Sequence, residues 1–165
     1  MKKIVLFAVL LFSVKNTDAQ PGKYAGSMKK MLNKTYTDEK HISGLTGWSF
    51  QEGSLITPAD DPEVMTANVF KKGTTYIVLF SIKEDTTDAK FTIADVLEVK
   101  NVLSSRQIRT GTCTDGVNEL IDIVALIKKE TTESSKAIKA WRLNRDKRRI
   151  EVASSKLIKC MNEVD

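Results

Sequence analysis

The segment Thr75–Ile82, TYIVLFSI, constrains the fold of this chain more than any other stretch. Its side chains are mostly β-branched or aromatic, which favours a central strand that is buried on both faces. Val64–Phe70 alternates loosely between apolar and polar residues, and the turn signal Lys71–Thr74 separates the two segments. Gly73 in that turn can adopt a positive φ. Together the two segments predict a β-hairpin.

Further strand-like segments surround this hairpin, with turn signals about every 10–15 residues. We expect a short helix near Ser27–Lys34 and further strands at Gly47–Gln51, Phe91–Val99, Gln107–Thr112, Leu120–Ile127, Lys136–Asn144 and Ile150–Val152. Phe91–Val99 also contains a helix capping box, but its β-branched residues favour a strand. The apolar run Leu120–Ile127 is expected to be a central strand, although periodicity alone does not separate it from a buried helix. The sum predicts a mainly β chain that forms an antiparallel β-sandwich or a barrel-like single domain.

Residues 1–19 have the pattern of a secretory signal peptide. A basic start at Lys2 and Lys3 precedes the apolar run Ile4–Phe12, and Ala19 supplies a small residue for cleavage. A buried strand is the alternative interpretation. The run is too short to span a bilayer. We therefore expect a signal peptide at 1–19, a single β-rich domain at 20–165, and a periplasmic or secreted protein with no transmembrane anchor.

The chain has two cysteines, Cys113 and Cys160. Export to an oxidising compartment favours a disulfide between them, whereas two buried free thiols are the alternative. The loop between them is long, so the bond would stabilise the fold by about 4 kcal/mol through the chain entropy of the unfolded state. No C-x-x-C motif accompanies either cysteine, which argues against a redox role.

Most enzymatic chemistries lack their residues in this sequence. His41 is the single histidine, and no phosphate-binding glycine loop, nucleophile elbow or zinc-binding motif occurs. We therefore expect no catalytic residue, no metal and no cofactor. The enzymatic alternative is a carboxylate-dependent glycan hydrolase, which needs two carboxylates across a cleft. Its candidates are two loop clusters, Asp60, Asp61 and Glu63, and Glu84, Asp85 and Asp88. Asp95 and Asp122 lie among apolar residues, where a buried carboxylate needs hydrogen-bond partners.

The segment 136–159 is strongly basic. It carries nine lysines and arginines against Asp146 and Glu151, a net charge of +7. Such a hairpin is suited to a polyanion, with Trp141 as a stacking face beside Arg142. The predicted binding residues are Lys139, Trp141, Arg142, Arg145, Lys147, Arg148 and Arg149. The alternative is that the cations cover an exposed sheet face and protect an edge strand. Export and the lack of interleaved aromatic residues argue against a nucleic-acid partner.

Two short motifs carry a family resemblance, Lys139-Ala140-Trp141-Arg142 and, after a turn, Cys160-Met161-Asn162-Glu163. Across Ile121–Glu163 the chain resembles small exported proteins of unknown function from Bacteroidetes-type bacteria. The resemblance implies a secreted β-rich domain with a paired cysteine, and it implies no activity. From the charge pattern and the missing catalytic motifs, we expect an exported, non-catalytic binding or structural protein of the bacterial envelope, with an anionic glycan or an envelope protein as its partner.

Overall fold

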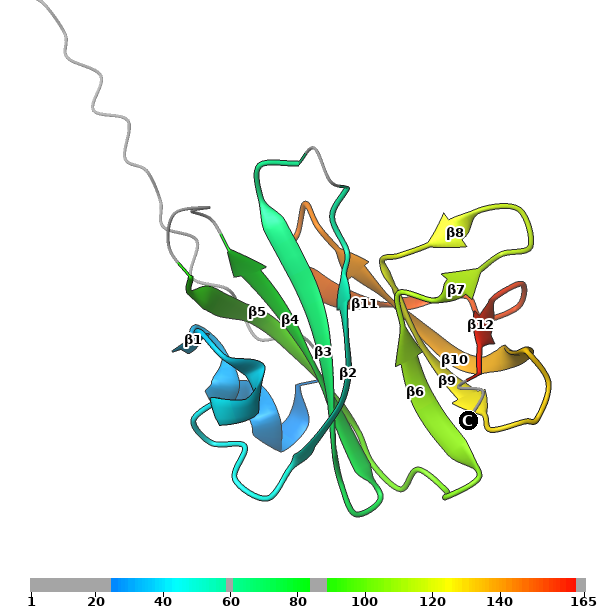
Figure 1. Cartoon of the computed structure of the whole chain (residues 1–165), viewed down its shortest axis with the longest axis horizontal. Coiled ribbons are helices and arrows are strands. Elements are labelled where there is room, and N and C mark those ends of the chain that lie inside the picture. Colours follow the sequence, from blue (N-terminus) through cyan, green and yellow to red (C-terminus); the bar gives the residue numbers. More distant parts are fainter. Residues whose placement is uncertain (1–24, 59–60, 84–88, 163–165) are drawn as a thin grey trace, which may run out of the picture.

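The computed structural model describes residues 25–58, 61–83 and 89–162, so the predicted signal peptide lies outside the described residues. The described chain is mainly β, with antiparallel sheets and one half-barrel, which confirms the predicted strand-rich architecture (Figure 1). Its strands are β1 (Thr35–Tyr36), β2 (Ser49–Leu55), β3 (Val64–Lys72), β4 (Thr75–Lys83), β5 (Phe91–Val99), β6 (Arg106–Thr110), β7 (Cys113–Thr114), β8 (Glu119–Leu120), β9 (Ile123–Lys128), β10 (Ser134–Asn144), β11 (Arg149–Ala153) and β12 (Lys159–Met161). Two 3-10 helices also occur in the described part, η1 (Gly26–Met31), which overlaps the segment of the expected helix, and η2 (Glu39–His41).

The first sheet has the order β1-β5-β4-β3-β2, and its pairings are antiparallel. β3 and β4 form the predicted hairpin, in which Lys72 pairs with Thr75 and Gly73 takes a φ of 58° in the turn. β4 lies between β3 and β5 and is buried along nearly its whole length, as its composition predicts. β5 confirms the strand interpretation of residues 91–99 over the helical one.

The second sheet has the order β6-β9-β10-β12-β7-β8, and β11 pairs with β10. The predicted strand Leu120–Ile127 is divided, because Leu120 in β8 pairs with Cys113, whereas β9 pairs with β6 and β10. The chain turns at Asp122, whose carbonyl accepts a hydrogen bond from the Leu143 amide at 2.8 Å. The predicted strand is therefore right in type and wrong in extent.

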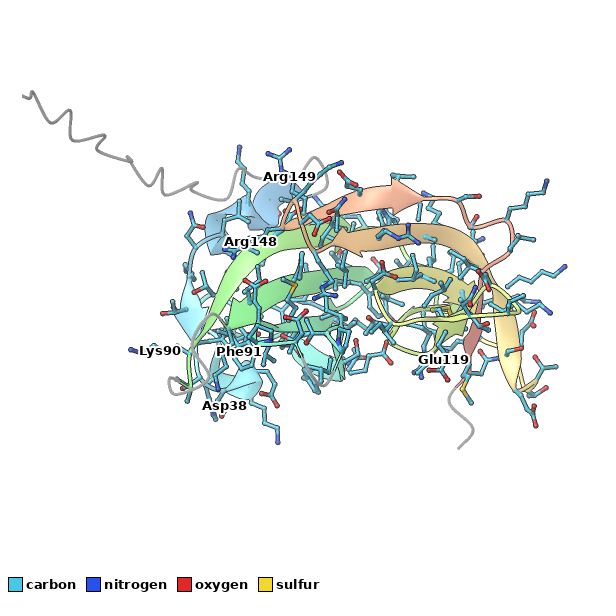
Figure 2. The ribbon with its side chains drawn as sticks, turned by 90° about the horizontal axis from the view of Figure 1, so that it is seen from above. Asp38, Lys90, Phe91, Glu119, Arg148 and Arg149 are labelled. Carbon is cyan, nitrogen blue, oxygen red and sulfur yellow. A yellow bond between two sulfur atoms is a disulfide. The ribbon has the colours of Figure 1, made fainter. Side chains whose placement is uncertain are left out.

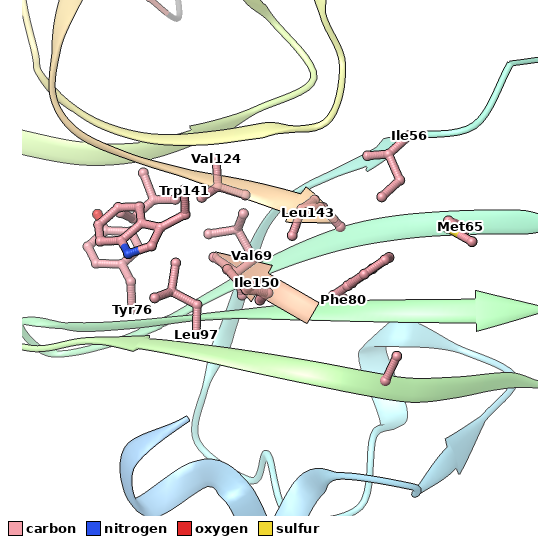
Figure 3. Close-up of a cluster of buried hydrophobic side chains, with 14 of the residues drawn as sticks. Ile56, Met65, Val69, Tyr76, Phe80, Leu97, Val124, Trp141, Leu143 and Ile150 are labelled. Atoms are coloured by element: carbon pink, nitrogen blue, oxygen red, sulfur yellow. The ribbon is translucent and has the colours of Figure 1, made fainter. Parts of the chain in front are cut away.

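Apolar clusters on both faces of each sheet show how the layers are arranged. The largest lies between the two sheets and joins Val69, Phe80 and Leu97 to Val124, Trp141 and Leu143 (Figure 3). A second cluster covers the outer face of the first sheet, where η1 brings Met28 and Met31 onto Ile77 and Leu79 of β4. The third lies on the other face of the second sheet, between β9 and β10 on one side and β7, β8 and β12 on the other.

The predicted disulfide between Cys113 and Cys160 is present. The two residues are direct cross-strand partners in β7 and β12, with Cα atoms 4.0 Å apart. Both side chains are buried in the third cluster. The bond therefore holds β12 in register with β7, and β12 in turn pairs with the first residues of β10.

A buried carboxylate joins the two sheets at β5 and β11. Asp95 of β5 is 0% exposed, and its Oδ2 accepts a hydrogen bond from the Ile150 amide of β11 at 2.8 Å. Its Oδ1 accepts from the Val96 amide at 2.8 Å. Asp95 thus has the partners that a buried carboxylate requires, and it anchors β11 to the first sheet.

A second carboxylate joins the sheets at β2 and β6. Glu52 of β2 accepts a hydrogen bond from the Thr110 amide at 2.7 Å and forms an ion pair with Arg109 at 2.9 Å. Gly111 follows with a φ of 69°, and a Cβ there would lie 2.5 Å from the Cβ of Ser54. The two sheets approach closely at this point, so the position requires glycine.

Candidate functional site

The basic segment forms a hairpin, as predicted. The chain that follows the hairpin pairs with β10 a second time, closer to the start of that strand. Residues 140–144 of β10 pair with 149–153 of β11, and the turn between them contains Arg148 at a φ of 50°. After the connection 154–158, β12 pairs with residues 134–136 of β10. β10 therefore has two charged ends, the tip at the hairpin turn 145–148 and the base at residues 134–139.

The cations near the tip meet carboxylates. The pairs are Arg145 with Asp61, Arg148 with Glu63 at 2.7 Å, Lys147 with Glu151 at 2.9 Å, and Arg142 with Asp122 at 3.1 Å. Asp61 and Glu63 belong to one of the two predicted carboxylate clusters. The structure thus brings two separately predicted sites together, and their charges offset each other. Arg149 is exposed at the start of β11.

Lys147 and Asn144 also act on the carboxylate of Glu151. The Lys147 ammonium donates to Oε1 at 2.9 Å, and the Asn144 amide donates to Oε2 at 2.9 Å. These hydrogen bonds, that from Lys147 first, lower the pKa of Glu151 below its ordinary value. The carboxylate therefore stays ionised, and bonded to Lys147 and Asn144 within the hairpin, to a lower pH.

The structure corrects the predicted role of Trp141. Its side chain is 6% exposed and lies in the cluster between the sheets (Figure 3). Arg142 follows directly in β10, so its side chain leaves the opposite face. Trp141 is therefore a core residue and offers no stacking face beside Arg142.

An open hollow lies at the tip. It has a volume of about 390 Å³ and is lined by Asp122, Arg142, Leu143, Asn144, Arg145 and Asp146. Arg142 and Arg145 each have an aspartate partner, Asp122 and Asp61 respectively. A small anion in the hollow would have to compete with these aspartates for the two arginines. The hollow is therefore a weaker candidate for an anion-binding site than the base of β10.

At the base, like charges stand directly opposite each other across neighbouring strands. Arg106 of β6 pairs with Lys128 of β9, and Lys136 of β10 pairs with Lys159 of β12. Ala137 pairs with Ile127, so Lys136 lies beside Lys128 in the same register. The four cations thus form a row across β6, β9, β10 and β12, about 14 Å long at the usual spacing between strands.

These cations also share one face of the sheet. Each of three lysines is adjacent in its strand to a residue of the third cluster. The adjacent pairs are Lys128 with Ile127, Lys136 with Ala137, and Lys159 with Cys160. Since neighbouring side chains alternate between faces, the lysines point to the face opposite that cluster. Lys139 pairs with Leu126, which belongs to the cluster between the sheets, and it therefore lies on that same opposite side. We refer to the surface of Arg106, Lys128, Lys136, Lys139 and Lys159 as the lysine face.

The lysine face has few compensating charges. Lys128 has an ion pair with Glu130 at 3.4 Å. Within residues 25–58, 61–83 and 89–162, no carboxylate lies within ion-pair distance of Arg106, Lys136, Lys139 or Lys159. Like charges directly opposite each other destabilise a sheet. β10 and β12 are both paired on two sides, so Lys136 and Lys159 do not protect a free strand edge.

The basic segment predicts Lys139 as a binding residue but does not predict Arg106 or Lys128. These two lie outside the basic segment, and only the pairing of β6 with β9 and of β9 with β10 brings them to it. Lys136 and Lys159 belong to the basic segment, but nothing in the sequence reveals that they are cross-strand neighbours.

The remaining titratable candidates have structural partners or lie outside the described residues. His41 is exposed and its Nδ1 contacts the carboxylate of Asp38 at 2.5 Å. The pKa of Asp38 is lowered first by a hydrogen bond from the Lys40 amide and then by the contact with His41. Asp60, Glu84, Asp85 and Asp88 lie outside the described residues. Among the described residues, no group of three His, Cys, Asp or Glu side chains is placed to hold a metal ion.

No protein-family model matches the chain, and neither the curated proteins nor the solved structures gave a match. In the described part of the chain, no helix is both long and apolar enough to cross a membrane.

Proposed function

We propose that the chain is an exported, non-catalytic binding protein of the bacterial envelope that holds an anionic partner on the lysine face. The observation that carries the proposal is the direct opposition of Lys136 and Lys159, which have no carboxylate partner among the described residues. Two ammonium groups at neighbouring positions repel each other, and an anion placed over both of them relieves that repulsion. We further propose that the two sheets act as a β-sandwich scaffold that fixes this face.

The tip has a different role in this proposal. Arg145 and Arg148 are occupied by Asp61 and Glu63, which connect the hairpin turn to the segment before β3. Asp61 and Glu63 each face one of these arginines, which supports a structural role for both carboxylates. We therefore assign these four residues to holding the hairpin in place.

The test compares two double variants with the same change in charge. Lys136→Glu/Lys159→Glu alters the base and Arg145→Glu/Arg148→Glu alters the tip. Binding is measured to immobilised heparin, as a soluble acidic glycan, and to phosphatidylglycerol vesicles. The base variant should lose binding to at least one of these probes, because its charge reversal lies in the site, while the tip variant retains most of it. Equal loss in both variants, or no binding of either probe by the unaltered protein, would contradict the proposal.

A further inference from the structure

Exposed apolar side chains are concentrated along the basic segment of the sequence. The described chain has eight large apolar residues that are exposed, and Ile138, Val152, Leu157 and Met161 all lie within or next to the basic segment. Val152 is 65% exposed and Met161 is 58% exposed. The other half of the set is spread over four separate loops and strand ends, at residues 50, 55, 103 and 117.

Two of these residues lie on the lysine face itself. Met161 is two residues beyond Lys159 in β12, and it pairs with Ser134, which is two residues before Lys136 in β10. Side chains two residues apart in a strand share a face. Val152 pairs with Trp141, which is two residues beyond Lys139, so Val152 and Lys139 also share a face. Val152 and Met161 therefore lie on either side of the lysines, on the same surface.

From this juxtaposition we propose that the lysine face docks onto an anionic lipid surface, with the lysines over headgroup phosphates and with Val152 and Met161 entering the interface. The inference rests on the proposed function and specifies the partner. A water-soluble polyanion would contact the ammonium groups and leave the apolar side chains in water. A bilayer interface takes up both, because surface binding combines buried apolar area with attraction to anionic headgroups.

The charge contribution is tested with vesicles. Sedimentation measures binding of the protein to vesicles of phosphatidylglycerol and phosphatidylcholine in equal parts, and to pure phosphatidylcholine. Each lysine near an anionic surface contributes about fivefold to the affinity, so Lys136→Gln/Lys159→Gln should weaken binding by about 25-fold. Binding to pure phosphatidylcholine should be weaker than to the mixed vesicles by more than that factor. Equal binding to the two vesicle types would overturn the proposal.

The apolar contribution has its own variant and a matched control. Val152→Ser/Met161→Ser should weaken vesicle binding by about tenfold, since less apolar area enters the interface. Leu55→Ser/Val117→Ser removes two exposed apolar residues elsewhere and should leave vesicle binding unchanged. Circular dichroism checks that both variants keep their strand content, which is expected because all four side chains are exposed.

Heparin separates the failure of this inference from failure of the proposed function. If heparin and the mixed vesicles bind equally well and Val152→Ser/Met161→Ser changes neither, the partner is a soluble polyanion, and the lipid proposal is wrong while the proposed function stands. If neither probe binds, both are wrong.

Discussion

The tip and the base of β10 carry the same kind of charge and differ in what faces them. At the tip, Arg145 and Arg148 meet Asp61 and Glu63 from the segment before β3. At the base, Lys136 meets Lys159, and no carboxylate of the described chain is within ion-pair distance of either. Figure 2 shows that Arg148 and Arg149 lie toward one end of the molecule and Glu119 of β8 toward the other.

A count of basic residues therefore does not locate a binding surface. The positive charge of the segment 136–159 suggests one continuous basic hairpin. The fold neutralises the tip by packing it against an acidic loop and leaves the base open to solvent. The disulfide and Asp95 reinforce this division, because the first holds β12 at the base and the second holds β11 near the tip.

The largest effect is expected from removing the support of the base. Cys113→Ser/Cys160→Ser should lower the free energy of unfolding by about 4 kcal/mol, because the bond no longer restricts the unfolded chain. Denaturant unfolding measures this loss. The third cluster contains both cysteines, so hydrogen exchange should rise in β7 and β12 before it rises in β3 and β4. Uniform exchange throughout the chain would show that the base has no separate dependence on the disulfide.

The support of the tip gives the next largest effect. Asp95→Ala should cost about 2–3 kcal/mol of stability, because the buried amide of Ile150 loses its acceptor. Thermal or denaturant unfolding measures the change. Asp95→Asn is the matched control, since its amide oxygen can still accept one of the two hydrogen bonds and should retain part of the stability. An Asp95→Ala variant as stable as the unaltered protein would show that Asp95 does not anchor β11.

Removing a single positive charge should change the stability in opposite directions at the two ends of β10. Arg148→Gln removes a half-exposed ion pair with Glu63 and should cost about 0.5 kcal/mol. Lys136→Gln removes repulsion from Lys159 and should stabilise the protein by a few tenths of a kcal/mol, on the order of other cross-strand pairs. Unfolding in low salt measures both changes. If Lys136→Gln is destabilising, Lys136 has a structural role like that of the tip arginines.

The smallest effect is a pH dependence confined to the tip. The pKa of Glu151 is lowered in the folded protein, so its contribution to stability is present above its unfolded pKa near 4.5 and is lost as the pH falls through the folded value. The stability difference between the unaltered protein and Glu151→Gln should therefore disappear at low pH. Lys147→Gln should remove much of the same pH dependence, since Lys147 is the main cause of the lowered pKa. An unchanged pH profile in Glu151→Gln would contradict this assignment.

The central elements of the fold could be predicted from local sequence. TYIVLFSI can be buried on both faces of a sheet, and Gly73 fits the tight turn before it. The disulfide could be predicted from the expected export and from an even number of cysteines. The division of Leu120–Ile127 could not be predicted from local sequence. Leu120 and Ile123 are both apolar, and they belong to different strands only because they pair with different partner strands.

The candidate site was harder to predict from the sequence, because its residues are brought together by an irregularity in β10. Strict alternation would place Lys136 and Lys139 on opposite faces of a strand, since they are three residues apart. An irregularity in β10 between Ala137 and Lys139 shifts the register and returns both to one face. The same alternation leaves open whether Trp141 or Arg142 points to the core, and the apolar cluster decides in favour of Trp141.

The most direct test of the division between tip and base is a lysine footprint on the unaltered protein. An amine-acetylating reagent is applied with and without phosphatidylglycerol vesicles, in parallel with and without heparin, and mass spectrometry gives the rate at each lysine. We predict that, with whichever probe binds, Lys136, Lys139 and Lys159 become several-fold less reactive, while Lys147 at the tip keeps its rate. Protection of Lys147 with no protection of Lys136 and Lys159 would contradict the assignment of binding to the base.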